Sequence, residues 1–284
     1  TIQWSYLDSI SERFNININK EGSQKLVMVA TKEVAEEQKV IFESALAGVL
    51  AVTSNLKVIE DMLNQANPSE DLTGGDLSLG ALSFDSVKTT TGSYVKSQNF
   101  GLSVGFAKNY NDELFYGAFF EGGFGSYDTF NDFASGELNG EGSSTHYGLG
   151  GFVKALFGDD YDNQIQASVR VGMLSNKFDA TLNEHNAAPA LVANDVDMSG
   201  MYYGASATYS RNLYTWERGK LWAYFGGAYT NLAGTDVEVG KDSFSIDAVS
   251  SFVLNLGAHY THSFDSYLGG FVKLGLEQEL MGES

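Results

Sequence analysis

From about residue 79 to the end of the 284-residue chain, apolar and polar residues alternate with a period of two, in unusually long segments. In the clearest segment, 164–176, Val169 and Val171 share one face with other apolar residues, whereas Arg170 lies among polar residues on the other. Successive side chains of a strand point to opposite faces, so this pattern predicts strands with one apolar and one polar face. Strands of soluble proteins are mostly about 5–6 residues long. Length and alternation together favour an all-β protein built from long strands.

The composition also favours long strands. The chain contains 32 glycines but only 2 prolines, and 13% of its residues are aromatic. Proline interrupts a strand ladder because it lacks an N–H donor, so its scarcity favours uninterrupted strands. Aromatic residues at strand ends, with aliphatic residues between them, are typical of an outer-membrane barrel. The aromatic residues near predicted strand ends are Tyr110, Tyr127, Phe130, Tyr161, Tyr214, Trp216, Tyr229 and Phe264.

The predicted connections are of two kinds. Residues 109–112 and 158–163 are short and polar, whereas residues 128–142 and 181–199 are predicted as longer loops. Alternating short and long connections predict an antiparallel up-and-down transmembrane β-barrel, with the short turns on the periplasmic side. The strands of a soluble β-sandwich also alternate, but they are shorter. The sequence therefore favours an all-β membrane barrel over a soluble β protein.

The N-terminal part is organised differently. Residues 1–30 alternate like two short strands, and in residues 31–66 apolar residues recur at three- and four-residue spacing, which predicts an amphipathic helix. Thr31 is its expected N-cap, and Asn67-Pro68 is its expected end, because a proline disfavours helical geometry in the residue before it. The longest unbroken apolar run, 45–52, is far shorter than the ~18 residues of a transmembrane helix, so we expect none. The apolar stripe of the predicted helix comprises Phe42, Leu46, Val49, Leu50, Leu56, Ile59 and Leu63.

Charge and residue types exclude several functions. The net charge is −19, and nucleic-acid binding requires clustered lysine and arginine. The absence of cysteine excludes disulfides and thiolate zinc sites. His259 and His262 are three residues apart on a predicted strand, so they face opposite sides and cannot share a metal ion. Gly148, Gly150 and Gly151 do not complete a dinucleotide-binding motif, and close packing of the backbone explains them better. We therefore expect no catalytic residue, no metal and no cofactor.

One stretch resembles a known family. Residues 117–134 (GAFFEGGFGSYDTFNDFA) resemble the GxFFExGxGxYxTxNxF segment of autotransporter β-domains. Residues 146–151, 201–205 and 243–251 resemble later segments of that family. Each piece is short, and their order along the chain makes the resemblance specific. It extends from roughly residue 32 to the end of the chain.

The resemblance implies type V secretion, through an outer-membrane barrel of about twelve strands whose preceding helix lies in the lumen. It assigns residues 1–30 to the end of a passenger β structure and residues 31–66 to a linker and lumen helix. Residues 67–80 become a loop and residues 81–284 the barrel. At about twenty-two residues per strand and connection, the last range holds about nine strands, so we expect a barrel truncated at its C-terminus.

Charged residues on the polar faces of the strands are the candidate lumen site. They could pair with polar positions on the predicted helix, such as Glu43, Lys57 and Glu60. The lumen-facing candidates are Lys154, Arg170, Lys273, Glu277 and Glu279.

The function that follows from the resemblance is a non-catalytic outer-membrane anchor and translocator of an upstream passenger. The expected partners are outer-membrane lipid, the covalently attached passenger and the barrel assembly machinery, without nucleic acid, and the expected state is a monomer. The expected location is the outer membrane of a Gram-negative-type bacterium. Two alternatives remain: a free-standing porin or adhesin-like barrel with residues 1–66 as its plug, and a soluble extracellular β-rich binding protein.

Overall fold

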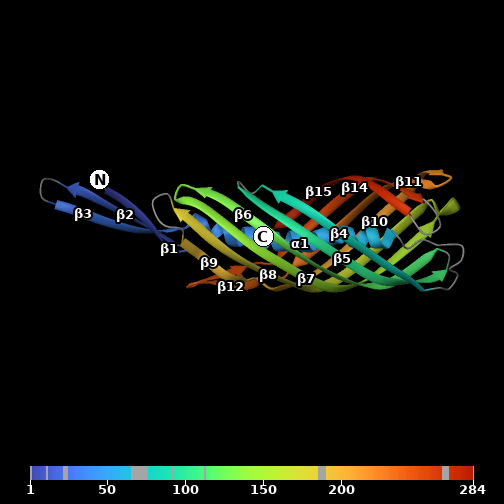
Figure 1. The fold of residues 1–284 in the computed structure, drawn as a ribbon, viewed down its shortest axis with the longest axis horizontal. Helices are drawn as coiled ribbons and strands as arrows, with labels where there is room; N and C mark the ends of the chain where they lie inside the picture. The colour runs from blue at the N-terminus through green and yellow to red at the C-terminus, as the bar shows by residue number, and fades with distance from the viewer. Residues whose placement is uncertain are drawn as a thin grey trace.

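A long antiparallel sheet curls around a single helix in the computed structural model of the chain (Figure 1). The structure describes residues 2–10, 12–21, 25–64, 76–90, 93–111, 113–184, 190–263 and 269–283. Pro68, the expected end of the helix, lies outside these residues.

The main sheet consists of long strands that follow one another in chain order. Each strand on the path from β4 to β15 has between 14 and 22 residues and pairs antiparallel with its neighbours. Among the described residues no pairing joins β4 to β15, so these two strands form the edges of a curled, open sheet. The prediction of long, up-and-down, antiparallel strands around an N-terminal helix is confirmed. The strands are β4 (Asp76–Thr89), β5 (Tyr94–Asn111), β6 (Leu114–Phe133), β7 (Gly136–Phe157), β8 (Asn163–Glu184), β10 (Gly200–Trp216), β11 (Gly219–Leu232), β14 (Val249–Ser263) and β15 (Gly269–Glu283).

Smaller elements gather at one end of the main sheet, here called the loop end. Strand β9 (Ala190–Asp197) pairs with β8, and β12 (Thr235–Val239) pairs with β13 (Asp242–Ile246) as a separate hairpin. A three-stranded sheet of β1 (Ile2–Ser9), β2 (Glu12–Glu21) and β3 (Lys25–Val34) projects beyond this end (Figure 1). The opposite end, here called the turn end, carries the short connections, including the 3₁₀ turn Asp159–Tyr161.

The predicted long loop at 128–142 is wrong. Strand β6 continues to Phe133 and β7 begins at Gly136, so the two strands pair almost throughout this range. Residues 181–199 likewise contain the end of β8 and all of β9. These segments contain many polar residues, which suggested loops, but the polar side chains of residues 128–133 alternate between the two faces of paired strands. Asn131 is buried inside, whereas Asp128 and Asp132 are exposed outside.

The helix begins later than predicted. Thr31 lies in β3, opposite Asn15 of β2, because the ladder formed by the β-branched segment overrides a local capping signal. A short 3₁₀ turn, Glu36–Gln38, precedes α1 (Lys39–Asn64), which runs inside the curled sheet (Figure 1). The first barrel strand begins at Asp76, five residues before the expected boundary at residue 81.

The expectation that no helix is apolar enough to cross a membrane needs correction. The stretch Glu36–Asn64 passes that test by length and composition, although 67% of its most apolar window is buried inside the protein. An unbroken run of apolar residues is too strict a criterion, because single polar residues can interrupt an apolar helix while its mean hydropathy stays high. A helix buried in a core has the same composition, so this finding alone does not place the helix in a membrane.

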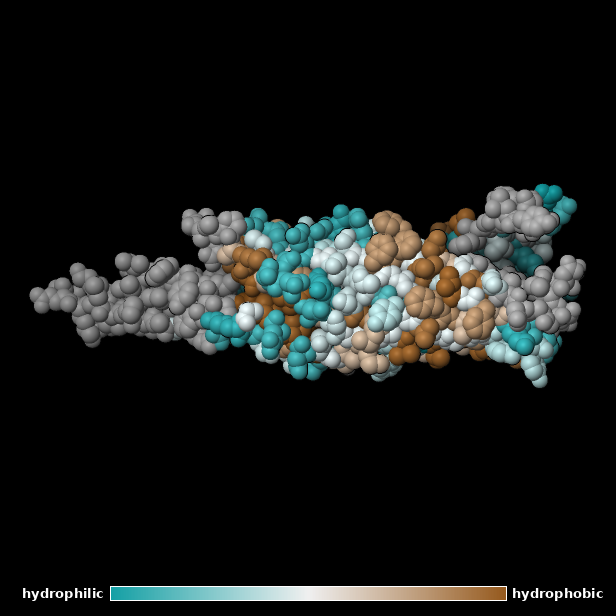
Figure 2. Space-filling model, turned by 60° about the horizontal axis from the view of Figure 1, so that its bottom comes forward, coloured by the Kyte–Doolittle hydropathy of each residue, from teal (hydrophilic) through white to brown (hydrophobic). Residues whose placement is uncertain are grey.

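The polarity of the two sheet faces reverses along the strands. Near the turn end of β8, Val169 and Val171 are exposed on the outer face, whereas Arg170 is buried on the inner face. Near the loop end of the same strand, Phe178 is buried inside and Lys177 is exposed outside. On the face in Figure 2, tan and brown side chains gather toward the turn end, and most of the teal side chains lie toward the loop end, where a further brown group lies among them. One half of the sheet is therefore apolar outside and polar inside, and the other half is the reverse.

Candidate functional site

Small residues allow α1 to lie close against the inner wall of the sheet. A Cβ atom added to Gly48 would lie 3.0 Å from Leu174 Cδ2 and 3.2 Å from Asn176 Nδ2. Larger side chains on this helix face would push the helix away from β8. The buried residues of this face include Val40, Ile41, Ser44, Ala47, Gly48, Ala51, Val52, Asn55, Val58, Ile59 and Met62.

The predicted apolar stripe only partly coincides with this buried face. Val49, Leu56, Ile59 and Leu63 are buried, but Leu46 and Leu50 are half-buried. Phe42 is 48% exposed. The sequence pattern selected large apolar residues, whereas the buried face also includes small ones such as Ser44, Ala47 and Gly48.

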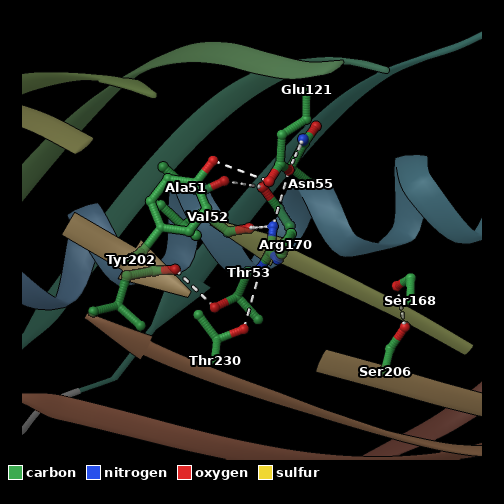
Figure 3. Close-up of polar contacts among 12 residues, drawn as sticks. Ala51, Val52, Thr53, Asn55, Glu121, Ser168, Arg170, Tyr202, Ser206 and Thr230 are labelled. Carbon is green, nitrogen blue, oxygen red and sulfur yellow. Dashed lines mark hydrogen bonds and ion pairs between the residues drawn. The ribbon is translucent and has the colours of Figure 1, made fainter. Parts of the chain in front are cut away.

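A buried ion pair lies at the centre of the lumen. The guanidinium of Arg170 on β8 is 3.0 Å from Glu121 Oε2 on β6, and both side chains are almost completely buried (Figure 3). Asn55 Nδ2 of α1 donates to Glu121 Oε2 at 2.7 Å, and the Tyr202 hydroxyl of β10 donates to Glu121 Oε1 at 3.0 Å. Buried charges require such partners, because desolvation otherwise exceeds the Coulomb attraction. One carboxylate therefore joins two further strands and the helix.

Three wall residues donate hydrogen bonds to main-chain carbonyls of the helix. Asn176 Nδ2 donates to Ser44 O at 2.6 Å, Arg170 Nη1 to Val52 O at 3.1 Å and Lys154 Nζ to Leu63 O at 3.3 Å. The last contact lies in the final turn, where helix carbonyls lack an internal partner and a cation is favourable. The wall thus holds the helix at its beginning, middle and end.

Side-chain pairs hold the turn-end half of the helix to β14 and β15. Lys273 Nζ lies 3.1 Å from Glu60 Oε2, and Asn255 Nδ2 donates to Glu60 Oε1 at 3.3 Å. Lys57 Nζ lies 3.1 Å from Glu277 Oε2, with both side chains about half exposed. Exposed pairs contribute only about 0–1 kcal/mol. The Glu60 cluster is more buried than the Lys57 pair and is expected to contribute more.

The loop-end half of the helix makes other polar contacts. Asn131 Nδ2 of β6 donates to Glu43 Oε2, and Lys39 Nζ, one turn earlier in the helix, lies 3.5 Å from Glu43 Oε1. Ser135, beside the tip of the β6–β7 hairpin, donates through Oγ to Glu37 Oε1 at 2.7 Å. These contacts place the start of the helix inside the loop end.

Of the five predicted lumen residues, Lys154, Arg170, Lys273 and Glu277 contact the helix. The side chain of Glu279 lies outside the described part of the structure.

Glu121, whose carboxylate has three side-chain partners in the lumen, was not among the predicted lumen residues. Its strand phase could have revealed it, because Glu121 shares the inner face of β6 with Phe119. Asn55 and Tyr202 gave no such signal.

The described residues offer no arrangement typical of a metal site. No group of three or more His, Cys, Asp or Glu side chains among them is placed to hold a metal ion. His259 is buried and stacks on Trp222, with ring centroids 6.1 Å apart. His262 instead contacts Tyr260, with Nδ1 3.0 Å from the hydroxyl. The two histidines therefore belong to different faces of β14, as their spacing predicted.

Gly150 illustrates the close packing that the sequence analysis expected at residues 148–151. A Cβ atom on Gly150 would lie 2.1 Å from Phe119 Cζ, and Phe119 packs with Ile59 and Met62 of the helix. A Cβ atom on the adjacent Gly151 would come no closer than 3.6 Å to its nearest neighbour, Gly117 O. The position of the Phe119 ring therefore requires a glycine at residue 150.

We expect Gly150→Ala to reduce the free energy of unfolding by about 1–3 kcal/mol, because it overpacks the wall and displaces Phe119. Gly151→Ala is the matched control and should change it by less than about 0.5 kcal/mol. Denaturant unfolding of the two purified variants measures the difference. Equal stability of the two would show that the aromatic ring can move at no cost.

The curled antiparallel sheet with a helix in its lumen resembles, in architecture, the translocator domains of two autotransporters. The translocator domain of the autotransporter NalP from Neisseria meningitidis is similar, with a TM-score of 0.62 and 14% identity, over 85% of this chain and 79% of that one. The β-domain of the Bordetella autotransporter BrkA is similar over 73% of this chain and 80% of that one, with a TM-score of 0.53 and 14% identity.

No family model matches the sequence, and no curated protein matches it. The two solved structures confirm the resemblance found in the sequence as a resemblance of fold. At this identity the two structures establish architecture, and function is inferred from the lumen and the outer face.

Proposed function

We propose that the chain is an outer-membrane anchor and translocator for a passenger attached ahead of the helix, without catalysis of its own. The observation that carries the proposal is the reversed polarity of the turn-end half of the sheet. Its outer face is apolar and its inner face holds buried ions and amides, which is the arrangement of a barrel in lipid. The proposed location is accordingly the outer membrane of a Gram-negative-type bacterium.

The length of the apolar stretch supports a membrane span. The outward residues of β7 between Tyr147 and Phe157 are apolar or glycine and end in aromatic rings, as in interfacial girdles. A membrane-spanning β-strand requires about 9–11 residues, and residues 147–157 cover that length. Other exposed apolar residues are Val104, Phe106, Phe120, Leu149, Val153, Val169, Val171, Leu256, Leu274 and Leu276. A soluble monomer rarely exposes contiguous apolar patches beyond a few hundred Å², so the soluble alternative is disfavoured.

The course of the chain supports translocation rather than a simple pore. The helix passes through the lumen from the loop end to the turn end and connects the projecting sheet β1–β3 to the barrel. In this arrangement strands β1–β3 lie on the loop-end side, whereas the first barrel strand, β4, begins at the turn end. A passenger ahead of β1 would thus lie outside the cell, tethered through the lumen. We extend the domain assignment accordingly: residues 1–30 form the base of the passenger, and residues 31–66 include the tether.

A reporter domain fused ahead of Thr1 tests this function. If the chain translocates, the reporter becomes accessible to protease added to intact cells, and it remains attached to the membrane fraction. A chain from which residues 31–66 are deleted provides the control, because its barrel lacks the tether through the lumen. A reporter that stays in the periplasm with a correctly folded barrel would favour the free-standing porin with a plug.

Assembly by the barrel assembly machinery and a monomeric state belong to the same proposal.

A further inference from the structure

In the described part of the chain, the hairpin β12–β13 is not joined to the barrel by a strand ladder. Its two strands pair with each other from Thr235↔Ile246 to Val239↔Asp242, and among the described residues no ladder joins them to β11 or β14. Strand β9, by contrast, extends the ladder of β8. An isolated two-stranded hairpin is at best marginally stable in water. The position of this hairpin therefore depends on side-chain contacts.

Those contacts come from one face of the hairpin. Val237 and Val239 are 1% and 3% exposed, and Ile246 is also buried. They belong to an apolar cluster that includes Val40 and Ile41 of the first helical turns. The hairpin thus packs with an apolar underside into the cluster that surrounds the start of the lumen helix, and it lies against β9.

The opposite face of the hairpin is polar and exposed. Asp236, Glu238, Ser243 and Ser245 all point to solvent. The barrel strands at the loop end show the same division, with Phe178 buried inside and Lys177 exposed outside. It is the division expected of a cover that has water on one side only.

Two short connections without strand pairing join the hairpin to the barrel. They are residues 233–234 before β12 and residues 247–248 after β13. A Cβ atom on Gly234 would lie 2.7 Å from Ile246 O and 3.1 Å from Ala248 N, so the two connections cross in close contact. Ala233 N donates to Met201 O at 2.8 Å, which fixes the barrel side of this crossing to β10. A small cavity lies beneath the crossing, lined in part by Ala45, Met198 and Thr235.

From these observations we infer that β12–β13 is a hinged lid. It closes the loop end of the lumen over the first turns of α1 and swings outward about residues 233–234 and 247–248 when a chain occupies the mouth. This inference rests on the proposed function in one respect: the chain that opens the lid is the passenger. The closed position itself requires only the apolar contacts described here.

Single-cysteine variants can measure the lid, because the chain has no cysteine of its own. In the purified protein, a thiol at Val237→Cys on the underside should react with an impermeant maleimide about tenfold or more slowly than one at Glu238→Cys on the exposed face. The two positions are adjacent on one strand, so they form a matched pair. Equal labelling rates would overturn the closed lid, and Val239→Cys should repeat the result for Val237→Cys.

The hinge is tested by Gly234→Val in the Val237→Cys background. The new side chain would meet backbone atoms on both sides of the crossing, so the hairpin should be displaced and the protection of the thiol lost. Glu238→Cys should label at the same rate with or without Gly234→Val. Protection that survives this change would place the attachment elsewhere and overturn the hinge.

Opening is tested in cells with a passenger whose export is arrested by a folded segment. The thiol at residue 237 should then become reactive from outside, and it should be protected again once export is complete. Protection that persists in the arrested chain would overturn the lid. A passenger that never reaches the surface would instead count against the proposed function, and the result with purified protein would still decide whether the lid exists.

Discussion

Glu121→Ala is expected to destabilise the barrel by about 3–5 kcal/mol, because it leaves Arg170 as a buried charge without its carboxylate. The Arg170 side chain is 1% exposed, and its remaining contacts, to Val52 O and Thr230 Oγ1, are to neutral oxygens. Asn55 and Tyr202 lose their acceptor in the same step. Denaturant unfolding of the purified protein measures the effect, and helix release is an expected early event.

Two control variants test whether the lost stability comes from the unpaired charge of Arg170. Glu277→Ala removes the half-exposed partner of Lys57 and should cost only about 0–1 kcal/mol. The double variant Glu121→Leu with Arg170→Met replaces both charges by apolar groups and should recover most of the lost stability. If Glu121→Ala is as mild as Glu277→Ala, then water reaches Arg170 and the lumen is not closed around the network.

The sequence could predict the strands because their signal is local. Alternation over a segment such as 164–173 decides which side chains share a face, and the structure places Val169 and Val171 outside and Arg170 inside. The alternation in the sequence could not show where along each strand the outer face changes from apolar to polar. The inner residues of β8 change from polar to apolar between Arg170 and Phe178 while the period of two continues, so no break marks the boundary.

The contacts of the lumen could not be predicted for a different reason. Asn55, Glu121, Arg170 and Tyr202 come from four elements, and Asn55 and Glu121 are 66 residues apart in the chain. Their meeting depends on the register of every strand between β6 and β10 together with the position of the helix. The helix face also escaped prediction, because Gly48 and Ala51 contribute to the contact by being small, which a search for large apolar residues passes over.

Leu149→Arg is expected to reduce the stability of the folded barrel in a lipid bilayer by about 2–4 kcal/mol. Leu149 is 63% exposed on the outer face of β7, opposite Val171 of β8, within the apolar stretch 147–157. An arginine there must place its charge in hydrocarbon or distort the bilayer to reach water. The loss of stability therefore reports whether residue 149 is surrounded by lipid or by water, and it does not report packing within the protein.

Glu141→Arg is the matched control, because residue 141 lies on the same strand and the same outer face, beyond the change of polarity. Surface substitutions in water usually change stability by less than about 0.5 kcal/mol, so this variant should unfold like the parent. Reversible unfolding from lipid bilayers, carried out on both variants in parallel, gives the two free energies. A soluble β protein would tolerate both changes equally, and equal stabilities would therefore contradict the membrane barrel. A loss confined to Leu149→Arg places the apolar half of the sheet in lipid and leaves the loop end, with its lid and its projecting strands, in water.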